Sequence, residues 1–169
     1  MIIIYIRHYF KEYSNRQSST FPYDPKIIND NGNITNLSDQ LVKLYGIPNI
    51  IFTSPYERTR QTAQLLKSNI DTSIIIDNTL SEYINDKYNV VLNNIVRPDT
   101  FIHNPPINET RIEFINRIKK HQDKITNLDN GIYWIITHGL FIKKLLNIDY
   151  PNPLEVNIVQ FNNNPSKIS

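Results

Sequence analysis

The sequence begins with MIIIYIRHYF, residues 1–10, in which an apolar run leads directly into an arginine and a histidine. The continuous run Ile2–Ile6 is typical of a β-strand that is covered on both faces. Buried strands usually end in turn-forming residues such as glycine, asparagine or aspartate. Arg7 and His8 therefore indicate either a strand end that reaches solvent or a strand that carries both side chains to the edge of an active site.

Further segments of the same kind follow along the chain. Apolar runs predict strands over residues 49–53, 73–76, 132–137 and 156–161. Amphipathic patterns predict helices over about 35–45, 55–66, 108–125 and 139–146. This alternation favours an α/β fold, a three-layer sandwich with a mostly parallel central sheet flanked by helices. We expect one domain over residues 1–161 and a polar C-terminal tail over 162–169.

Two of the helices carry more detailed predictions. Thr35 or Ser38 is a candidate N-cap for the first helix, and Asn108 is a candidate N-cap for the helix over about 108–125. The apolar face of the latter helix is expected to consist of Ile112, Ile115 and Ile118. The residues expected on the surface are Arg60, Arg111, Arg117, His103 and His121, whereas Trp134 is expected in the core.

Composition limits the possible classes of protein. A chain of 169 residues suits a single domain, and its net charge of +2 is too small to indicate a nucleic-acid partner. The absence of cysteine excludes disulfides and thiolate metal sites. Residues 1–6 are too few to span a bilayer and lack the basic lead-in of a signal peptide. We therefore expect a soluble cytoplasmic protein without a membrane partner.

Polar side chains follow the ends of the predicted parallel strands. In open α/β sheets, ligands bind beyond the carboxyl ends of the strands. The polar residues at these positions, in chain order, are Arg7, His8, Ser54, Arg58, Glu82 and His138. We expect them to converge on one rim of the sheet. This favours the second interpretation of the Arg-His pair, in which the strand carries both side chains to the edge of an active site.

Such a set of side chains suits the chemistry of a phosphate group. Guanidinium groups bind phosphate oxygens in pairs. The surrounding positive charge favours the neutral form of imidazole, because it lowers the pKa from its reference value of ~6.5. A neutral imidazole has a lone pair that can attack phosphorus. A carboxylic acid near the leaving oxygen can protonate it and then activate water. Because this chemistry requires no metal, none is expected, and no cofactor is expected either.

Four blocks of sequence resemble the histidine phosphatase superfamily, the phosphoglycerate-mutase-like proteins. They are IYIRH at 4–8, IIFTSPYERTRQTAQLL at 50–66, LSE at 80–82 and IITHGLFIKKLL at 135–146. A weaker similarity is PPINETRIEFINRI at 105–118, which resembles the Gly-Glu-Ser helix start of one branch of the family. The blocks occur in the family's order, on the predicted elements.

The resemblance implies a role for each matched residue. His8 would be the nucleophile that becomes phosphohistidine, and Glu82 would be the general acid and base, with Glu109 as the rival carboxylate. The residues that would hold the phosphoryl group are Arg7, Arg58 and His138. Gly139 would let the backbone pass close to the pocket.

The chain departs from the family's pattern after His8. The usual glycine is replaced by Tyr9, whose ring would either point away or narrow the pocket mouth and contact the substrate. Asn15 is the candidate for the substrate-binding asparagine of the next loop, and Ser14 is its rival.

The resemblance implies a metal-independent phosphatase acting on phosphomonoesters. The substrate would be a small phosphorylated molecule or a phosphoprotein. Two alternatives remain open: a catalytically idle module that binds a phosphorylated ligand, and a phosphotransferase of the phosphoglycerate mutase type. The sequence does not predict an oligomeric state.

Overall fold

The computed structural model describes residues 1–11, 26–83 and 109–161. Their elements, in chain order, are β1 (Ile2–Arg7), α1 (Asn33–Tyr45), β2 (Ile50–Thr53), α2 (Glu57–Lys67), β3 (Ser73–Ile76), the short 3₁₀ helix η1 (Asn78–Leu80), α4 (Arg111–Thr126), β4 (Ile132–Thr137), α5 (Gly139–Leu146) and β5 (Val156–Gln160). Strands and helices therefore alternate as the sequence predicts.

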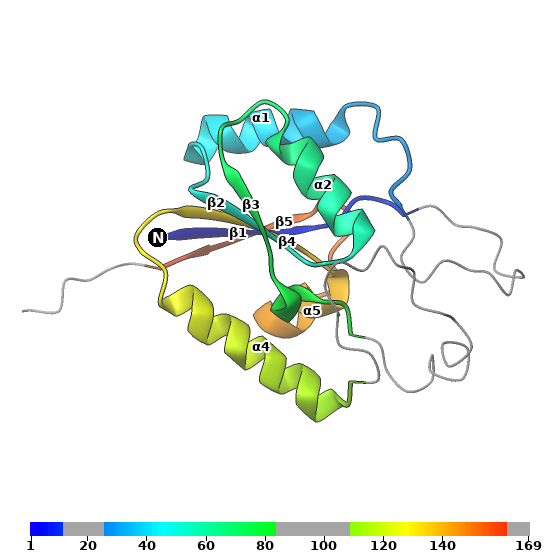
Figure 1. The fold of residues 1–169 in the computed structure, drawn as a ribbon, viewed down its shortest axis with the longest axis vertical. Coiled ribbons are helices and arrows are strands. Elements are labelled where there is room, and N and C mark those ends of the chain that lie inside the picture. The colour runs from blue at the N-terminus through cyan, green and yellow to red at the C-terminus, as the bar shows by residue number, and fades with distance from the viewer. Residues whose placement is uncertain (12–25, 84–108, 162–169) are drawn as a thin grey trace, which may run out of the picture.

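The five strands form one sheet in the order β3-β2-β4-β1-β5. The first four are parallel to one another, and β5 runs antiparallel along β1. Figure 1 shows α1 and α2 on one face of the sheet and α4 and α5 on the other. The predicted three-layer α/β fold with a mostly parallel sheet is confirmed.

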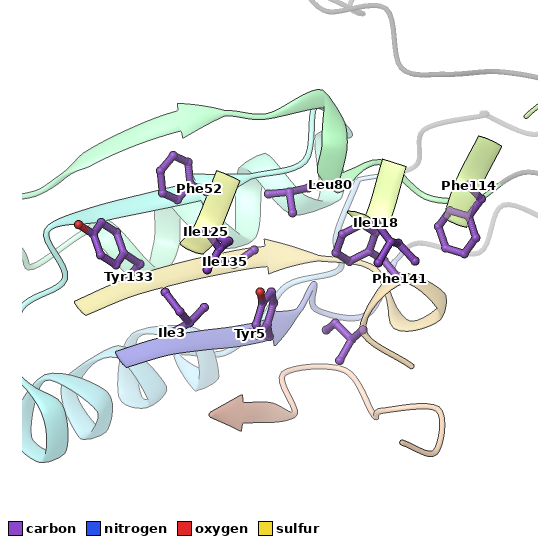
Figure 2. Close-up of a cluster of buried hydrophobic side chains, with 11 residues drawn as sticks. Ile3, Tyr5, Phe52, Leu80, Phe114, Ile118, Ile125, Tyr133, Ile135 and Phe141 are labelled. Atoms are coloured by element: carbon purple, nitrogen blue, oxygen red, sulfur yellow. The ribbon is translucent and has the colours of Figure 1, made fainter. Parts of the chain in front are cut away.

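Alternating side chains of the central strands fill two hydrophobic cores, one on each face. Ile3 and Tyr5 of β1 join the core under α4 and α5, which Figure 2 shows, whereas Ile4 and Ile6 join the core under α1 and α2. Trp134 is fully buried in the latter core, as predicted. Burial on both faces explains why β1 and β4 are continuous apolar runs.

Helix α1 begins before both of its predicted caps. Gly32 occupies the N-cap position with φ of 83°, in the left-handed region that glycine adopts without strain. The side chain of Asp30 accepts hydrogen bonds from the N–H groups of Gly32 and Ile34, and so satisfies donors of the first turn. Thr35 and Ser38 consequently lie within the helix.

Helix α4 turns a different face to the core than the sequence suggested. Thr110 caps it, in a capping box with Glu113, and the predicted cap Asn108 lies outside the described residues. Ile112, assigned to the apolar face, is 72% exposed. Ile118 is buried as predicted, but the other buried residues of the helix are Phe114, Arg117, His121 and Ile125.

The expected surface positions of Arg117 and His121 are therefore wrong. Both lie on the same stripe of α4 as the buried Phe114 and Ile118. His121 packs edge-on against Phe141, and its Nε2 shares a hydrogen bond of 3.1 Å with the Tyr5 hydroxyl. Each side chain is held inside by a polar partner from another part of the fold.

Among the helices in the described residues, none combines the length and the apolar character that crossing a bilayer would need. The predicted tail at 162–169 and His103 lie outside the described residues.

Candidate active site

The register of two neighbouring strands brings two histidines together. Arg7 of β1 pairs with Thr137 of β4, so His8 and His138 are the first residues beyond both strands. The backbone N–H of His8 donates to the carbonyl of Thr137 at 3.0 Å. The two imidazole rings lie edge to face with their centroids 5.3 Å apart, and both are buried.

Arg58 joins these histidines from the first turn of α2. Its Nε donates to Nε2 of His8 at 3.2 Å, and its Nη2 donates to Nδ1 of His138 at the same distance. The guanidinium lies 4.6 Å above the ring of Tyr56, which is fully buried and also touches His138 edge-on. The structure thus places Arg58, the predicted pocket arginine, beside both histidines, whereas Arg60 pairs with Glu57 on the same helix.

His8 is held in the form that a nucleophile needs. Its Nδ1 lies 2.6 Å from the carbonyl oxygen of Tyr9, and because a carbonyl only accepts, Nδ1 carries the proton. Nε2 therefore has the lone pair. Burial lowers the pKa of His8 well below its usual value, and the positive charge of Arg58 lowers it further.

His138 adopts the opposite tautomer. Because its Nδ1 accepts from Arg58, its Nε2 carries the proton and donates to the hydroxyl of Ser54 at 2.9 Å. Burial is the main reason that the pKa of His138 also lies well below its usual value, with Arg58 next. Both histidines are therefore neutral at neutral pH.

Glu82 supplies a carboxyl group to the same cluster from the segment after η1. Its Oε2 lies 3.4 Å from Nδ1 of His138 and 3.8 Å from Nη2 of Arg58. Burial raises the pKa of Glu82, although Arg58 acts in the opposite direction. This carboxyl group keeps its proton to a higher pH than a free glutamic acid, as a general acid requires.

Arg7 approaches the cluster from the end of β1. Its Nη1 donates to the carbonyl of Pro151 at 2.6 Å, and its guanidinium lies 4.6 Å above the ring of Tyr150. Its Nε is buried and has no hydrogen-bond partner among the described residues. A buried donor without a partner is costly, and the oxygen of an anionic ligand would satisfy it.

Tyr9 contributes its backbone, rather than its ring, to the site. The ring packs in the core beneath α1, where the hydroxyl accepts from Nδ2 of Asn33 at 3.1 Å. The Tyr9 N–H donates to the hydroxyl of Thr62 at 3.1 Å. This placement corresponds to the predicted alternative in which the ring points away from the pocket.

The backbone at Gly139 packs closely against the ring of Tyr150. A Cβ at this position would lie 2.5 Å from Cζ of Tyr150. The absence of a side chain thus makes room for the ring that supports Arg7. The other predicted substrate contact, Asn15, and its rival Ser14 lie outside the described residues.

The rival acid Glu109 is engaged elsewhere. Its two carboxylate oxygens accept from Nε and Nη2 of Arg117 at 2.7 and 2.6 Å in a buried ion pair. Among the described carboxylates, the structure brings Glu82 to the two histidines of the cluster.

The sequence placed Ser54 on the rim without a role and did not single out Tyr56, yet Ser54 accepts from Nε2 of His138 and Tyr56 packs against its ring. Ser54 directly follows β2 and was recognisable as a polar strand end. Nothing in the pattern marked Tyr56, because an aromatic residue before a helix usually indicates packing alone.

His8, Glu82 and His138 also have the composition of a metal site. One potential ligand atom from each lies within 4.8 Å of the others. The guanidinium of Arg58, however, donates to both ring nitrogens that would bind the metal. A permanent cation already engages those lone pairs, so the arrangement suits an anionic guest better than a metal ion.

A search of curated proteins finds no match to the chain. Among solved structures, the fold is similar to YhfR of Bacillus stearothermophilus, with a TM-score of 0.69, 16% identity and coverage of 96% of this chain and 92% of that chain. It is also similar to a phosphoserine phosphatase of Entamoeba histolytica in complex with 3-phosphoglyceric acid, with a TM-score of 0.62, 20% identity and coverage of 95% and 90%. A mycobacterial glucosyl-3-phosphoglycerate phosphatase gives a TM-score of 0.63 at 15% identity, with coverage of 94% and 89%.

The sequence pattern of the histidine phosphatase superfamily (branch 1) matches residues 34–157. The match spans α2, Glu82 and His138, and it begins after β1. The Arg7-His8 pair is therefore tied to the rest of the site by the geometry described above. The chain belongs to the histidine phosphatase superfamily.

Proposed function

We propose that this protein is a metal-independent phosphatase that hydrolyses phosphomonoesters through a phosphohistidine at His8. The observation that carries the proposal is the state of that imidazole. The Tyr9 carbonyl holds the Nδ1 proton, and the lone pair of Nε2 faces the donors of Arg58. A neutral nucleophile beside a fixed cation is suited to attack an anionic phosphoryl group.

In the first step, Arg58 moves its hydrogen bond from Nε2 of His8 to the phosphoryl group, and the freed lone pair of Nε2 forms a bond to phosphorus while the bond to the ester oxygen breaks. The electron pair of the broken bond stays on the departing oxygen, which takes the proton of Glu82. Arg58 and the unpartnered Nε of Arg7 donate to the equatorial oxygens, where negative charge is concentrated in the transition state. His138 lines the same space.

In the second step, the Glu82 carboxylate takes a proton from a water molecule as that water attacks phosphorus. The bond between phosphorus and Nε2 breaks, and its electron pair returns to the nitrogen. Inorganic phosphate leaves, and both His8 and Glu82 regain their starting protonation states. Each group thus acts once in each direction, as general acid–base catalysis requires.

A panel of phosphomonoesters and phosphopeptides, assayed for phosphate release, tests the activity and addresses the substrate class. We expect release by the wild type and loss of release in His8→Ala. His121→Gln is the matched control, because His121 is equally buried but lies on α4, in the core on that face.

The covalent intermediate is tested by rapid quench and mass spectrometry at neutral or alkaline pH. We expect phosphate on His8. A label on another residue, or turnover at the wild-type rate in His8→Ala, would contradict the proposal. Transfer of the phosphate to an acceptor alcohol in preference to water would favour the mutase alternative, and binding of phosphorylated ligands without turnover would favour the idle module.

A further inference from the structure

Three consecutive backbone carbonyls lead up to Glu82, and each accepts a hydrogen bond from a side chain of another element. Nη1 of Arg117 on α4 donates to the carbonyls of Thr79 and Ser81, both at 2.8 Å. The hydroxyl of Thr137 at the end of β4 donates to the carbonyl of Leu80 at 2.7 Å. The segment entering Glu82 is therefore fixed at successive residues from two sides.

Arg117 is itself fixed by a buried carboxylate. Its Nε and Nη2 bind Glu109 in a two-point contact, with 10% of the Arg117 side chain and 5% of the Glu109 side chain exposed. All of its donor nitrogens are thus engaged, two of them by the carboxylate and one by the two carbonyls. The planar guanidinium provides this fork, which a lysine ammonium group cannot reproduce.

The side chain of Glu82 has few restraints of its own. Its Oε1 accepts from the N–H of the adjacent Tyr83 at 3.3 Å, and its Oε2 lies 3.4 Å from Nδ1 of His138 and 3.8 Å from Nη2 of Arg58. A fifth of the side chain is exposed. The position of the carboxyl group is consequently set mainly by the backbone that carries it.

The clamp of Arg117 and Thr137 also relates Glu82 to the histidines. Thr137 directly precedes His138 and pairs with Arg7 in the sheet register. Its hydroxyl therefore ties the acid-bearing segment to the strand end from which His138 projects. An error of about 1 Å in such a distance is enough to cost on the order of 10²-fold in rate.

We propose that Arg117 is a positioning residue for proton transfer by Glu82, acting with Glu109 and Thr137. The inference rests on the proposed function, since it requires Glu82 to be the general acid. Arg117 touches neither the substrate nor the reacting atoms. Its effect should therefore appear only where the leaving oxygen needs a proton.

The test compares kcat/KM for an alkyl phosphate and for p-nitrophenyl phosphate, whose leaving group departs readily as an anion. This constant reports the steps up to the release of the alcohol. We expect Arg117→Lys to lower kcat/KM about 10-fold or more for the alkyl phosphate and much less for p-nitrophenyl phosphate. Thr137→Val removes the hydrogen bond to the carbonyl of Leu80 and should show the same selectivity. This variant replaces Arg117→Lys in the test if Arg117→Lys does not fold.

Lys124→Gln is the matched control. It removes the ion pair of 2.7 Å between α4 and Oδ2 of Asp77, but leaves in place the hydrogen bonds of Arg117 and Thr137 and those from Thr79 to Oδ1 of Asp77. We expect it to lower the melting temperature and to leave the ratio of the two kcat/KM values unchanged. An equal loss on both substrates in Arg117→Lys, or a selective loss in Lys124→Gln, would overturn the inference.

A double variant separates this inference from the proposed function. In a Glu82→Gln background, Arg117→Lys should cause no further selective loss, because the group that it positions is gone. A selective loss that persists in this background would show that Arg117 acts through another group. That result would overturn the inference without contradicting the proposed phosphatase function. Failure of the wild type to hydrolyse either substrate would instead contradict the proposed function.

Discussion

The Nε–H of Arg58 donates to Nε2 of His8 over 3.2 Å, so a permanent cation faces the nitrogen that carries the lone pair. Burial and this contact lower the pKa of His8, whereas burial raises the pKa of Glu82. The nucleophile and the acid of the proposed reaction thus have pKa values displaced in opposite directions. Displacements of this kind let an imidazole and a carboxylic acid coexist in their reactive forms.

The pH dependence of kcat/KM for an alkyl phosphate should reflect both displacements. Activity should persist below pH 6.5, because His8 stays deprotonated down to its lowered pKa. It should fall as the pH rises through the raised pKa of Glu82, because the ionised carboxylate has no proton to give. The measurement is phosphate release from about pH 4 to pH 9, compared with p-nitrophenyl phosphate.

Only the alkyl phosphate should show the alkaline decline due to Glu82, and Glu82→Gln should abolish that decline along with most of the activity. The second ionisation of the substrate, near pH ~6, affects both esters similarly and cancels in the ratio. A ratio that does not change with pH would remove Glu82 as the acid.

Tyr9 should matter for stability more than for substrate choice. Tyr9→Phe removes the hydroxyl that accepts from Asn33 and should cost about 1 kcal/mol in the free energy of unfolding. Asn33→Ala should cost a similar amount, and the double variant little more. Urea unfolding measures the cost, and the ester panel should keep the same order of preference in both variants. A changed order would place the ring at the pocket mouth.

The packing of Tyr150 on Gly139 should be essential for the support of Arg7. Gly139→Ala would place a Cβ 2.5 Å from the ring, which must then move off the Arg7 guanidinium. We expect KM to rise about 10-fold, in line with the loss of a cation–π contact. Tyr150→Ala should have the same effect, and combining the two should add little. Full additivity would mean that Gly139 acts independently of Tyr150.

The buried His121 should make the fold sensitive to acid. Burial lowers its pKa to about 4, whereas the unfolded chain binds the proton near pH 6.5. Because the unfolded state then holds more protons, stability should be lost as the pH falls from 6.5 toward 4, by up to roughly 3 kcal/mol at the lower end.

His8 and His138 act in the same direction, so the wild type alone does not isolate this effect. The comparison is between the wild type and His121→Gln, by urea unfolding at several values in this pH range. The variant should show the shallower slope. Parallel slopes would mean that His121 does not contribute.

Metal removal should leave the activity unchanged. Arg58 occupies the donors that a metal would need, so EDTA should have no effect and added zinc should not bind at the site. Arg58→Met removes the cation and exposes the three potential ligands. We expect this variant, unlike the wild type, to bind Zn²⁺ in a calorimetric titration, and a further His8→Ala change to abolish binding. If EDTA abolished the activity of the wild type and added zinc restored it, this prediction would be wrong.

The strands and the rim of the sheet were predictable because both depend on short stretches of sequence. Burial on two faces produced the continuous runs of β1 and β4, and the polar residues after them identified Arg7, His8 and His138. The order of the strands in the sheet then brought these residues together, as α/β topology implies.

The face of α4 was predicted only in part, correctly at Ile118 and wrongly at Ile112, because isoleucine was given more weight than position. Counting from Phe114 at helical spacing passes through Ile118, His121 and Ile125, and so places a histidine and Arg117 inside. Their burial depends on partners that are distant in sequence, such as the hydroxyl of Tyr5 and the carbonyls of Thr79 and Ser81. A local sequence pattern cannot predict the burial of a polar side chain whose hydrogen-bond partner lies elsewhere in the fold.

The pairing of β1 with β4 has a consequence for divergence within such a fold. His8 and His138 each stand one residue beyond a paired strand, so the spacing of the hydrogen-bonded ladder sets the distance between their rings. Long stretches of chain between them can be lengthened, shortened or rewritten without altering that distance. A lineage can therefore change the residues around the pocket while keeping the two histidines at the same distance, as long as the register of these two strands is kept.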